Sequence, residues 1–124
     1  MATKILIVDD AALTRKFLSD ILRQEGYEII GEAENNKEAV DKFNAFKPDL
    51  VMMDILMPNE NDIDRVEVIK NIIKNDKDAK IVMISTLGQH SLVVESMQAG
   101  AQDFIVKPFN PPLVLDTVRR VLGQ

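Results

Sequence analysis

The sequence predicts an α/β protein whose five parallel strands form a doubly wound sheet, each strand being followed by one of five helices. Short apolar runs alternate with amphipathic stretches along all 124 residues, as they do in sheets built with crossover helices. The first run is apolar throughout, as expected of a strand covered on both faces. Right-handed crossovers then favour the strand order 2-1-3-4-5 in one domain, residues 1–124.

The first strand is predicted at residues 5–8, and a helical pattern follows it. Gly26 is expected to end this helix. Five apolar residues recur at helical spacing and form one stripe that should face the sheet, namely Leu13, Phe17, Leu18, Ile21 and Leu22.

The second strand is predicted near residues 28–33, and the second helix is expected to begin at Asn35. Glu38 follows three residues later, which resembles a capping box. Val40 and Phe43 should point inward, and the helix must end before Pro48, because the residue preceding a proline disfavours helical geometry.

The third strand is predicted at residues 50–53, and a loop rich in Asn, Glu and Asp follows it. The third helix then places Val66, Ile69 and Ile73 on one face. The pattern indicates a buried strand followed by a helix that covers it.

The last two strands are predicted at residues 81–84 and 104–106, with a helix between them that ends at Gly100. That helix presents Val93 and Met97 to the core, and the final helix presents Leu115, Val118 and Leu122. Pro111 and Pro112 suit the first turn of this final helix.

The composition excludes several classes of protein. Fifteen basic against 20 acidic residues give a net charge of −5, which argues against nucleic acid as the partner. The absence of cysteine excludes disulfides and zinc–thiolate sites. No apolar run approaches the roughly 20 residues of a membrane span, and no signal-peptide pattern begins the chain. We expect a cytoplasmic, monomeric protein without a membrane partner.

Polar residues follow four of the predicted strands directly: Asp9 and Asp10, Asp54, Ser85, and Lys107. Each alone has an ordinary explanation, since Asp commonly forms turns and caps helices. Together they converge on the edge where doubly wound sheets bind ligands. Three acids so close together repel one another, so a cation should offset them, either Lys107 or a divalent metal.

Oxygen ligands without histidine or cysteine favour Mg²⁺ over zinc. Acids, Mg²⁺, a lysine and a hydroxyl are also the groups that phosphoryl transfer requires. Asp54 stands alone between the apolar Met53 and Ile55, so it is the expected nucleophile. Asp9 and Asp10 are the expected metal holders.

These motifs resemble the receiver domains of two-component response regulators. The match consists of residues 7–10 (Ile-Val-Asp-Asp), 53–58 (Met-Asp-Ile-Leu-Met-Pro), Ser85, and 106–109 (Val-Lys-Pro-Phe), and it covers essentially the whole chain. Because it joins several separated motifs, it is far more specific than a single short motif.

The resemblance implies a Mg²⁺-dependent phosphoacceptor at Asp54. It also implies metal ligation by Asp10, by Asp9 directly or through water, and by the Leu56 backbone carbonyl. Ser85 would be the switch hydroxyl, Phe104 the switch aromatic, and Lys107 the cation that binds the phosphoryl group. The bond between Lys107 and Pro108 is implied to be cis, and the protein is implied not to be an enzyme beyond its own phosphorylation and dephosphorylation.

Three departures from the family pattern affect these expectations. Asp62 stands where the family usually has glycine in the loop near the metal, and Phe104 where it often has tyrosine. Leu56 and Leu87 stand where relatives often have polar residues beside the phosphoryl group. Since leucine cannot hold an attacking water, slow loss of the phosphoryl group is expected.

Within the family, the chain resembles stand-alone chemotaxis receivers of the CheY type. This implies a chemotaxis histidine kinase, a motor switch or adaptor protein that binds the fourth helix, fifth strand and fifth helix, and a possible phosphatase. One alternative is a phosphorelay intermediate that passes the group to a histidine phosphotransfer protein. Others are a docking-only receiver, disfavoured by the intact acid set, and a nucleotide or flavin binder, disfavoured because the first strand–helix turn lacks glycines.

Overall fold

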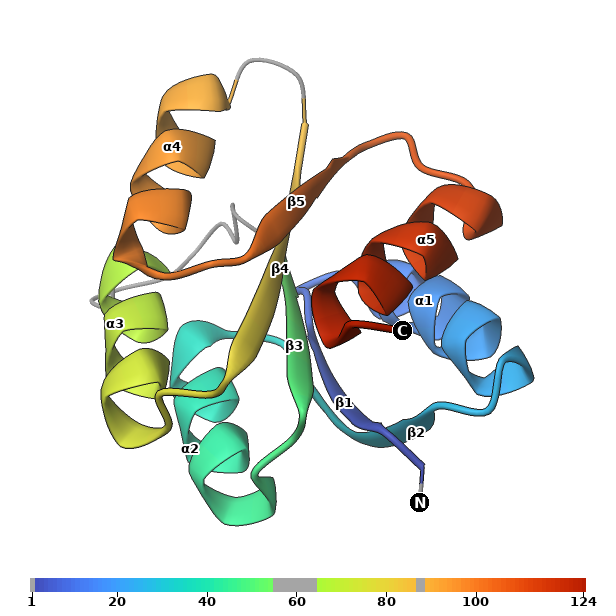
Figure 1. The fold of residues 1–124 in the computed structure, drawn as a ribbon, viewed down its shortest axis with the longest axis horizontal. Helices are drawn as coiled ribbons and strands as arrows, with labels where there is room; N and C mark the ends of the chain where they lie inside the picture. Colours follow the sequence, from blue (N-terminus) through green and yellow to red (C-terminus); the bar gives the residue numbers. More distant parts are fainter. Residues whose placement is uncertain (1, 55–64, 87–88) are drawn as a thin grey trace.

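The computed structural model describes residues 2–54, 65–86 and 89–124, which form a five-stranded sheet and five helices (Figure 1). Their order along the chain is β1 (Lys4–Val8), α1 (Ala12–Gln24), β2 (Glu28–Ala33), α2 (Asn36–Phe46), β3 (Leu50–Asp54), α3 (Arg65–Asn75), β4 (Lys80–Ser85), α4 (His90–Ala99), β5 (Asp103–Val106) and α5 (Pro111–Leu122).

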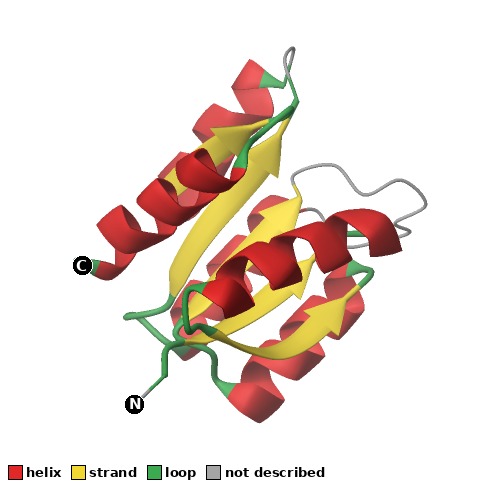
Figure 2. Cartoon of the chain, turned by 90° about the vertical axis from the view of Figure 1, so that its right-hand side faces the viewer, coloured by secondary structure: helices red, strands yellow, loops and turns green. Residues whose placement is uncertain are grey.

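All neighbouring strands pair in parallel, in the order β2-β1-β3-β4-β5. The predicted fold class and strand order are therefore confirmed. Figure 2 shows the strands pointing the same way, away from the end of the sheet where both chain termini lie. The carboxyl ends of β1, β3, β4 and β5 thus meet along one edge.

Helices cover both faces of the sheet, with α1 and α5 on one side and α2, α3 and α4 on the other (Figure 1). Successive residues of a strand point to opposite faces. Ile5 and Ile7 accordingly pack in the α1–α5 layer, whereas Leu6 and Val8 pack against α2 to α4. This double coverage explains why the strand sequence is apolar without alternation.

The expected helix boundaries have identifiable caps. The Asn35 side chain accepts a hydrogen bond from the Glu38 amide at 2.8 Å. The Glu38 carboxylate in turn accepts one from the Glu34 amide at 3.3 Å, so the reciprocal bond goes to the residue before the cap. Helix α4 ends at Gly100 with φ of 130°, where a Cβ would lie 2.9 Å from Ile73.

The stripe predicted for the first helix is wrong at its first turn. Leu18, Ile21 and Leu22 are buried, but Leu13 is 80% exposed and Phe17 44%. The start of α1 lies beside the carboxyl edge of the sheet, where few sheet residues remain to cover it. Periodicity identifies the stripe of a helix but not how far that helix extends past the sheet.

In the part of the chain that the structure describes, each helix is too short or too polar to cross a membrane.

Candidate functional site

Three carboxylates converge at the carboxyl edge of the sheet. Asp9 follows β1 and is fully buried, Asp54 is the last residue of β3 and is 7% exposed, and Asp10 is exposed. One oxygen from each lies within 4.8 Å of the others. β1 and β3 are neighbours in the sheet, which is why residues 45 positions apart in sequence come together.

Lys107, just beyond β5, supplies a cation to this cluster. Its Nζ lies 3.1 Å from Asp54 Oδ2, as a hydrogen bond, and 3.7 Å from Asp9 Oδ2. Burial would lower the pKa of Lys107, but the hydrogen bond and charge of Asp54 oppose burial, and with the charges of Asp9 and Asp10 they raise that pKa above its ordinary value. Lys107 is therefore held as an ammonium ion next to Asp54.

The surroundings favour the charged form of Lys107 but the neutral, protonated form of Asp9. The pKa of Asp9 is raised from 3.8 to about 6, and burial is the largest cause. The Ala11 amide, which donates to Asp9 Oδ1 at 2.9 Å, lowers that pKa, the charge of Asp54 raises it, and the charge of Lys107 lowers it. An ionised Asp9 is thus unfavourable in the metal-free protein and would be favoured by a further cation.

The residues present fit a divalent metal. Asp9 Oδ2 is buried and accepts no hydrogen bond from the described residues. The cluster contains three carboxyl groups and one ammonium group, so acidic groups outnumber the cation that offsets them. Mg²⁺ prefers carboxylate oxygens, and one oxygen from each of the three carboxylates lies within 4.8 Å of the others. Histidine and cysteine are absent from the cluster, which disfavours zinc.

Ser85 lies on β4 and Phe104 on β5. By the alternation of side chains along each strand, both belong to the face of the sheet that α4 covers, whereas Asp54 belongs to the face that α1 and α5 cover. The register pairs Asp54 with Ile84, so Ser85 lies one residue further along the neighbouring strand. Ser85 is 2% exposed and Phe104 41% exposed. The Ser85 carbonyl accepts a hydrogen bond from the Lys107 amide at 2.7 Å. The Lys107–Pro108 bond, which the resemblance implies to be cis, is cis.

Three residues of the sequence-based prediction, Leu56, Asp62 and Leu87, lie outside the described residues. The metal-binding role of the Leu56 carbonyl, the effect of Asp62 and the expected slow dephosphorylation stay predictions.

Arg15 on α1 belongs to the site but was absent from the sequence-based prediction. Its Nη1 donates to the Asp9 carbonyl at 2.7 Å, and its Nε donates to Glu32 Oε1 at 2.9 Å. Arg15 precedes Leu18 by three residues and Leu22 by seven, so it lies on the buried stripe of α1. A charged residue on that stripe was the available signal, because a buried charge needs a partner.

A cavity of about 680 Å³ adjoins the acid cluster. The rings of Phe17 and Phe109 stack within it, with centroids 5.7 Å apart. Lys107 lines the cavity and also contacts Asp54. The complete lining is Leu13, Thr14, Phe17, Thr86, Lys107, Pro108 and Phe109. The exposed start of α1 therefore forms an apolar surface next to the ion pair of Lys107 and Asp54.

Comparison with known proteins identifies close relatives. CheY of Thermotoga maritima is 50% identical over 121 residues, which span 98% of both chains. CheY of Bacillus subtilis is 48% identical over 123 residues, covering 99% of this chain and all of that protein. Both are described as chemotaxis proteins.

Solved structures agree in fold. The CheX–CheY–BeF₃–Mg²⁺ complex of Borrelia burgdorferi contains a chain that matches with a TM-score of 0.88 at 39% identity, over 98% of this chain and 90% of that one. The response regulator domain of Thermotoga maritima CheB matches with a TM-score of 0.86 at 31% identity, over 100% and 98%. The sequence model of the family described as "Response regulator receiver domain" matches residues 5–119 of this chain. The chain therefore belongs to the response regulator receiver domain family and is similar to the chemotaxis receivers of the CheY type.

Proposed function

We propose that this protein is a chemotaxis response regulator, in which a histidine kinase phosphorylates Asp54 in a Mg²⁺-dependent reaction. The phosphorylated protein then changes its binding to a motor switch or adaptor protein. The observation that carries this proposal is the pairing of Asp54 with Lys107 inside an acid cluster at the strand ends. Similarity to CheY proteins supports the chemotaxis assignment.

In the proposed reaction, an Asp54 carboxylate oxygen bonds to phosphorus as the bond from phosphorus to the donor's imidazole nitrogen breaks. Lys107 is already within hydrogen-bond distance of Asp54, so its ammonium can pair with the phosphoryl oxygens without a large rearrangement. The chain acts only on its own phosphoryl group, so we do not propose an enzyme with a separate substrate.

Asp9, Asp10 and Asp54 are the side chains proposed to hold Mg²⁺. When bound, the ion neutralises charge on the phosphoryl oxygens. Asp9 contributes the oxygen that accepts no hydrogen bond from the described residues, and Asp10 contributes from the exposed loop after β1. The CheY of Borrelia burgdorferi was crystallised with Mg²⁺ and BeF₃, which is consistent with this assignment.

The proposed switch joins the two sides of the sheet. A phosphoryl group on Asp54 offers acceptors to the hydroxyl of Ser85 at the end of β4. Ser85 moving toward it would leave room for the half-exposed ring of Phe104 to turn inward. Phosphorylation then shifts the population between two packed states.

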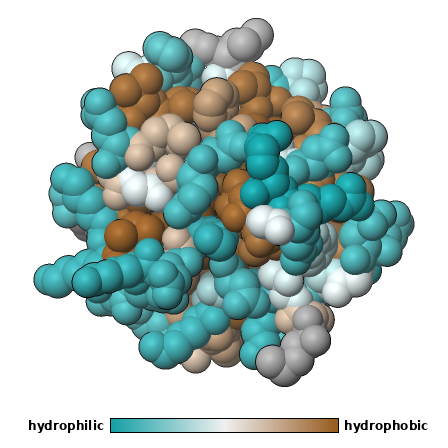
Figure 3. Space-filling view, in the orientation of Figure 1, coloured by the Kyte–Doolittle hydropathy of each residue, from teal (hydrophilic) through white to brown (hydrophobic). Residues whose placement is uncertain are grey.

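Two surfaces suit two kinds of partner. The cavity beside Lys107 suits the kinase domain that brings the phosphoryl group, because that domain must approach Asp54 closely. The face formed by α4, β5 and α5 suits the downstream protein, and its apolar patches are visible in Figure 3. A phosphatase is a third proposed partner, and the cytoplasm is the proposed location. The CheY of Borrelia burgdorferi was crystallised in a complex with CheX, so a protein similar to CheX is a further candidate partner.

Mass spectrometry tests the phosphoacceptor. After incubation with a small acyl phosphate and Mg²⁺, the parent should gain one phosphoryl group and Asp54→Asn should gain none. Asp20→Asn, which replaces an exposed aspartate paired with Lys16 on α1, is the matched control and should be phosphorylated like the parent. A fully phosphorylated Asp54→Asn protein would contradict the assignment, and an unreactive parent would contradict the proposed function.

A further inference from the structure

Every polar atom of Asp9 except one has a defined hydrogen-bond partner. Its amide donates to the Ala33 carbonyl at 2.9 Å, and its Oδ1 accepts from the Ala11 amide at 2.9 Å. Its carbonyl accepts from Arg15 Nη1 at 2.7 Å. Only Oδ2 accepts no hydrogen bond from the described residues. Hydrogen bonds therefore fix both the amide and the carbonyl of Asp9, and the Oδ2 oxygen stays available to the acid cluster.

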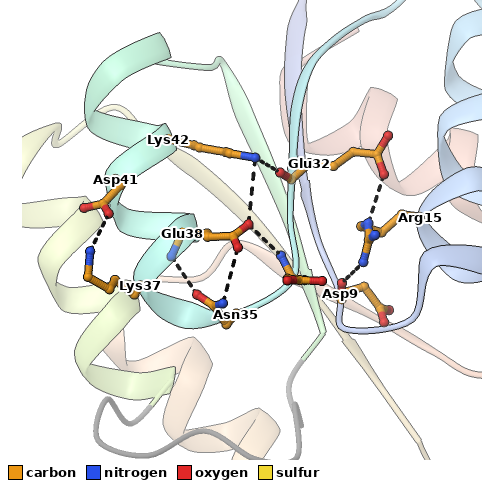
Figure 4. Close-up of polar contacts among 9 residues, drawn as sticks. Asp9, Arg15, Glu32, Asn35, Lys37, Glu38, Asp41 and Lys42 are labelled. Carbon is orange, nitrogen blue, oxygen red and sulfur yellow. Dashed lines mark hydrogen bonds and ion pairs between the residues drawn. The ribbon is translucent and has the colours of Figure 1, made fainter.

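Arg15 is itself held firmly in place. Its Nε pairs with Glu32 Oε1 of β2 at 2.9 Å, and its side chain is only 16% exposed. Lys42 of α2 donates to the Glu32 carbonyl and pairs with Glu38 at 3.8 Å. Figure 4 shows this chain of contacts running from α2 through Glu32 to Arg15 and Asp9. Arginine suits the central position because its fork donates in two directions at once.

We infer that Arg15 is a positioning residue for the Mg²⁺ site, acting through the peptide bond between Asp9 and Asp10. This inference rests on the proposed metal site. The peptide unit is planar, so holding the Asp9 carbonyl also orients the Asp10 amide and the Cα that follows it. Asp10 is exposed and lies outside the strand. The Arg15 hydrogen bond thus reduces the number of conformations that Asp10 can adopt before the metal binds. Fewer conformations are then lost when the Asp10 carboxylate binds the metal.

A purely structural role for the Arg15–Glu32 ion pair predicts a different result. In that case the pair ties α1 to β2, and its loss lowers stability without altering metal affinity. Partners that orient metal ligands change affinity by roughly 10- to 100-fold when removed. Mg²⁺ affinity measured beside folding stability therefore separates the two roles.

The first experiment compares Arg15→Gln with Arg119→Gln by calorimetric Mg²⁺ titration at fixed pH and ionic strength. Arg119 pairs with Glu25 at 3.1 Å, so it is a matched arginine–glutamate pair without contact to the acid cluster. Arg15→Gln should bind Mg²⁺ roughly tenfold or more weakly, and Arg119→Gln should match the parent. Equal affinity of Arg15→Gln and the parent would overturn the inference. A parent that does not bind Mg²⁺ would overturn the metal site as well.

Glu32 variants keep the test decisive if Arg15→Gln fails to fold. Glu32→Gln retains an oxygen that can accept from Arg15 Nε, and Glu32→Ala does not. Glu32→Ala should therefore weaken Mg²⁺ binding and Glu32→Gln should restore most of it. The ¹⁵N shift of the Asp10 amide in the metal-free protein provides a second readout, because that peptide carries the Arg15 hydrogen bond. It should move in Glu32→Ala but not in Arg119→Gln, and an unmoved shift with unchanged affinity would overturn the inference.

Discussion

Asp9 shows how one buried residue links stability to metal binding. It is fully buried, and its carbonyl, amide and Oδ1 are all hydrogen-bonded to protein groups. The fold thus orients a carboxylate whose ionised form it stabilises poorly. Such a residue favours whichever cation restores its charge balance.

The raised pKa of Asp9 predicts a pH-dependent cost to the metal-free fold. Because the folded pKa of about 6 exceeds the ordinary 3.8, the folded state holds the proton more tightly. The stability that the protonated Asp9 carboxyl group contributes to the fold is fully present below about pH 4 and is lost as pH rises through about 6. The shift corresponds to roughly 3 kcal/mol. Denaturant unfolding of the parent and Asp9→Asn in EDTA, at pH 4.5 and 7.5, measures it.

Asp9→Asn should be the more stable protein at the higher pH, and the difference should shrink at the lower pH. The amide of asparagine keeps an acceptor for the Ala11 N–H, so the local turn is preserved. Adding Mg²⁺ at the higher pH should stabilise the parent more than the variant. A difference that does not change with pH would contradict the predicted titration.

The start of α1 shows at the scale of an element what periodicity can and cannot predict. The buried part of the apolar stripe, Leu18, Ile21 and Leu22, was predicted correctly, but Leu13 and Phe17 near the start of the helix stay exposed. The same apolar residues then form a surface rather than core. Exposed large apolar residues beside a reactive group are typical of docking surfaces.

Replacement of Leu13 tests this surface. Leu13 is 80% exposed, so Leu13→Ser should barely change stability. It should slow phosphotransfer from the histidine kinase severalfold but leave phosphorylation by a small acyl phosphate unchanged. Phe46→Ser, at the end of α2 and 48% exposed, is the control with normal kinase transfer. Equal slowing with both donors would instead indicate a disturbed acid cluster.

The face formed by α4, β5 and α5 should report phosphorylation. Beryllofluoride with Mg²⁺ mimics the tetrahedral phosphoryl group, so amide shifts can be compared with and without it. We expect changes at Ser85, Phe104 and along α4, because Ser85 and Phe104 share the side of the sheet that α4 covers. Phe104→Ala should weaken target binding without preventing phosphorylation. Shift changes confined to α2 would contradict the proposed switch.

At the scale of the whole molecule, the sequence predicted most of the fold because strands and helices alternate strictly. β1, β3, β4 and β5 each contain a short apolar run, and caps such as Asn35 and Gly100 mark helix ends locally. The acid cluster was predictable because strand order alone brings β1 and β3 together. Arg15 was not predicted, because its partners, Asp9 just after β1 and Glu32 on β2, come together only in the folded protein. Its position on the buried stripe of α1 indicates that it needs a partner, but neither spacing nor composition identifies that partner, which depends on how the helix is rotated on its sheet.

In the proposed function, the alternation of side chains across the sheet separates the site of phosphorylation from the surface that binds the target. Asp54 and the cavity beside Lys107 lie on the side of α1 and α5, whereas Ser85 and Phe104 lie on the side of α4. A small molecule lodged between Phe17 and Lys107 would thus obstruct loading by the kinase while leaving an already loaded protein free to engage its target. Such a compound would inhibit phosphorylation by the kinase but not target binding by the phosphorylated protein. Its effect would appear only as fast as existing phosphoryl groups are lost.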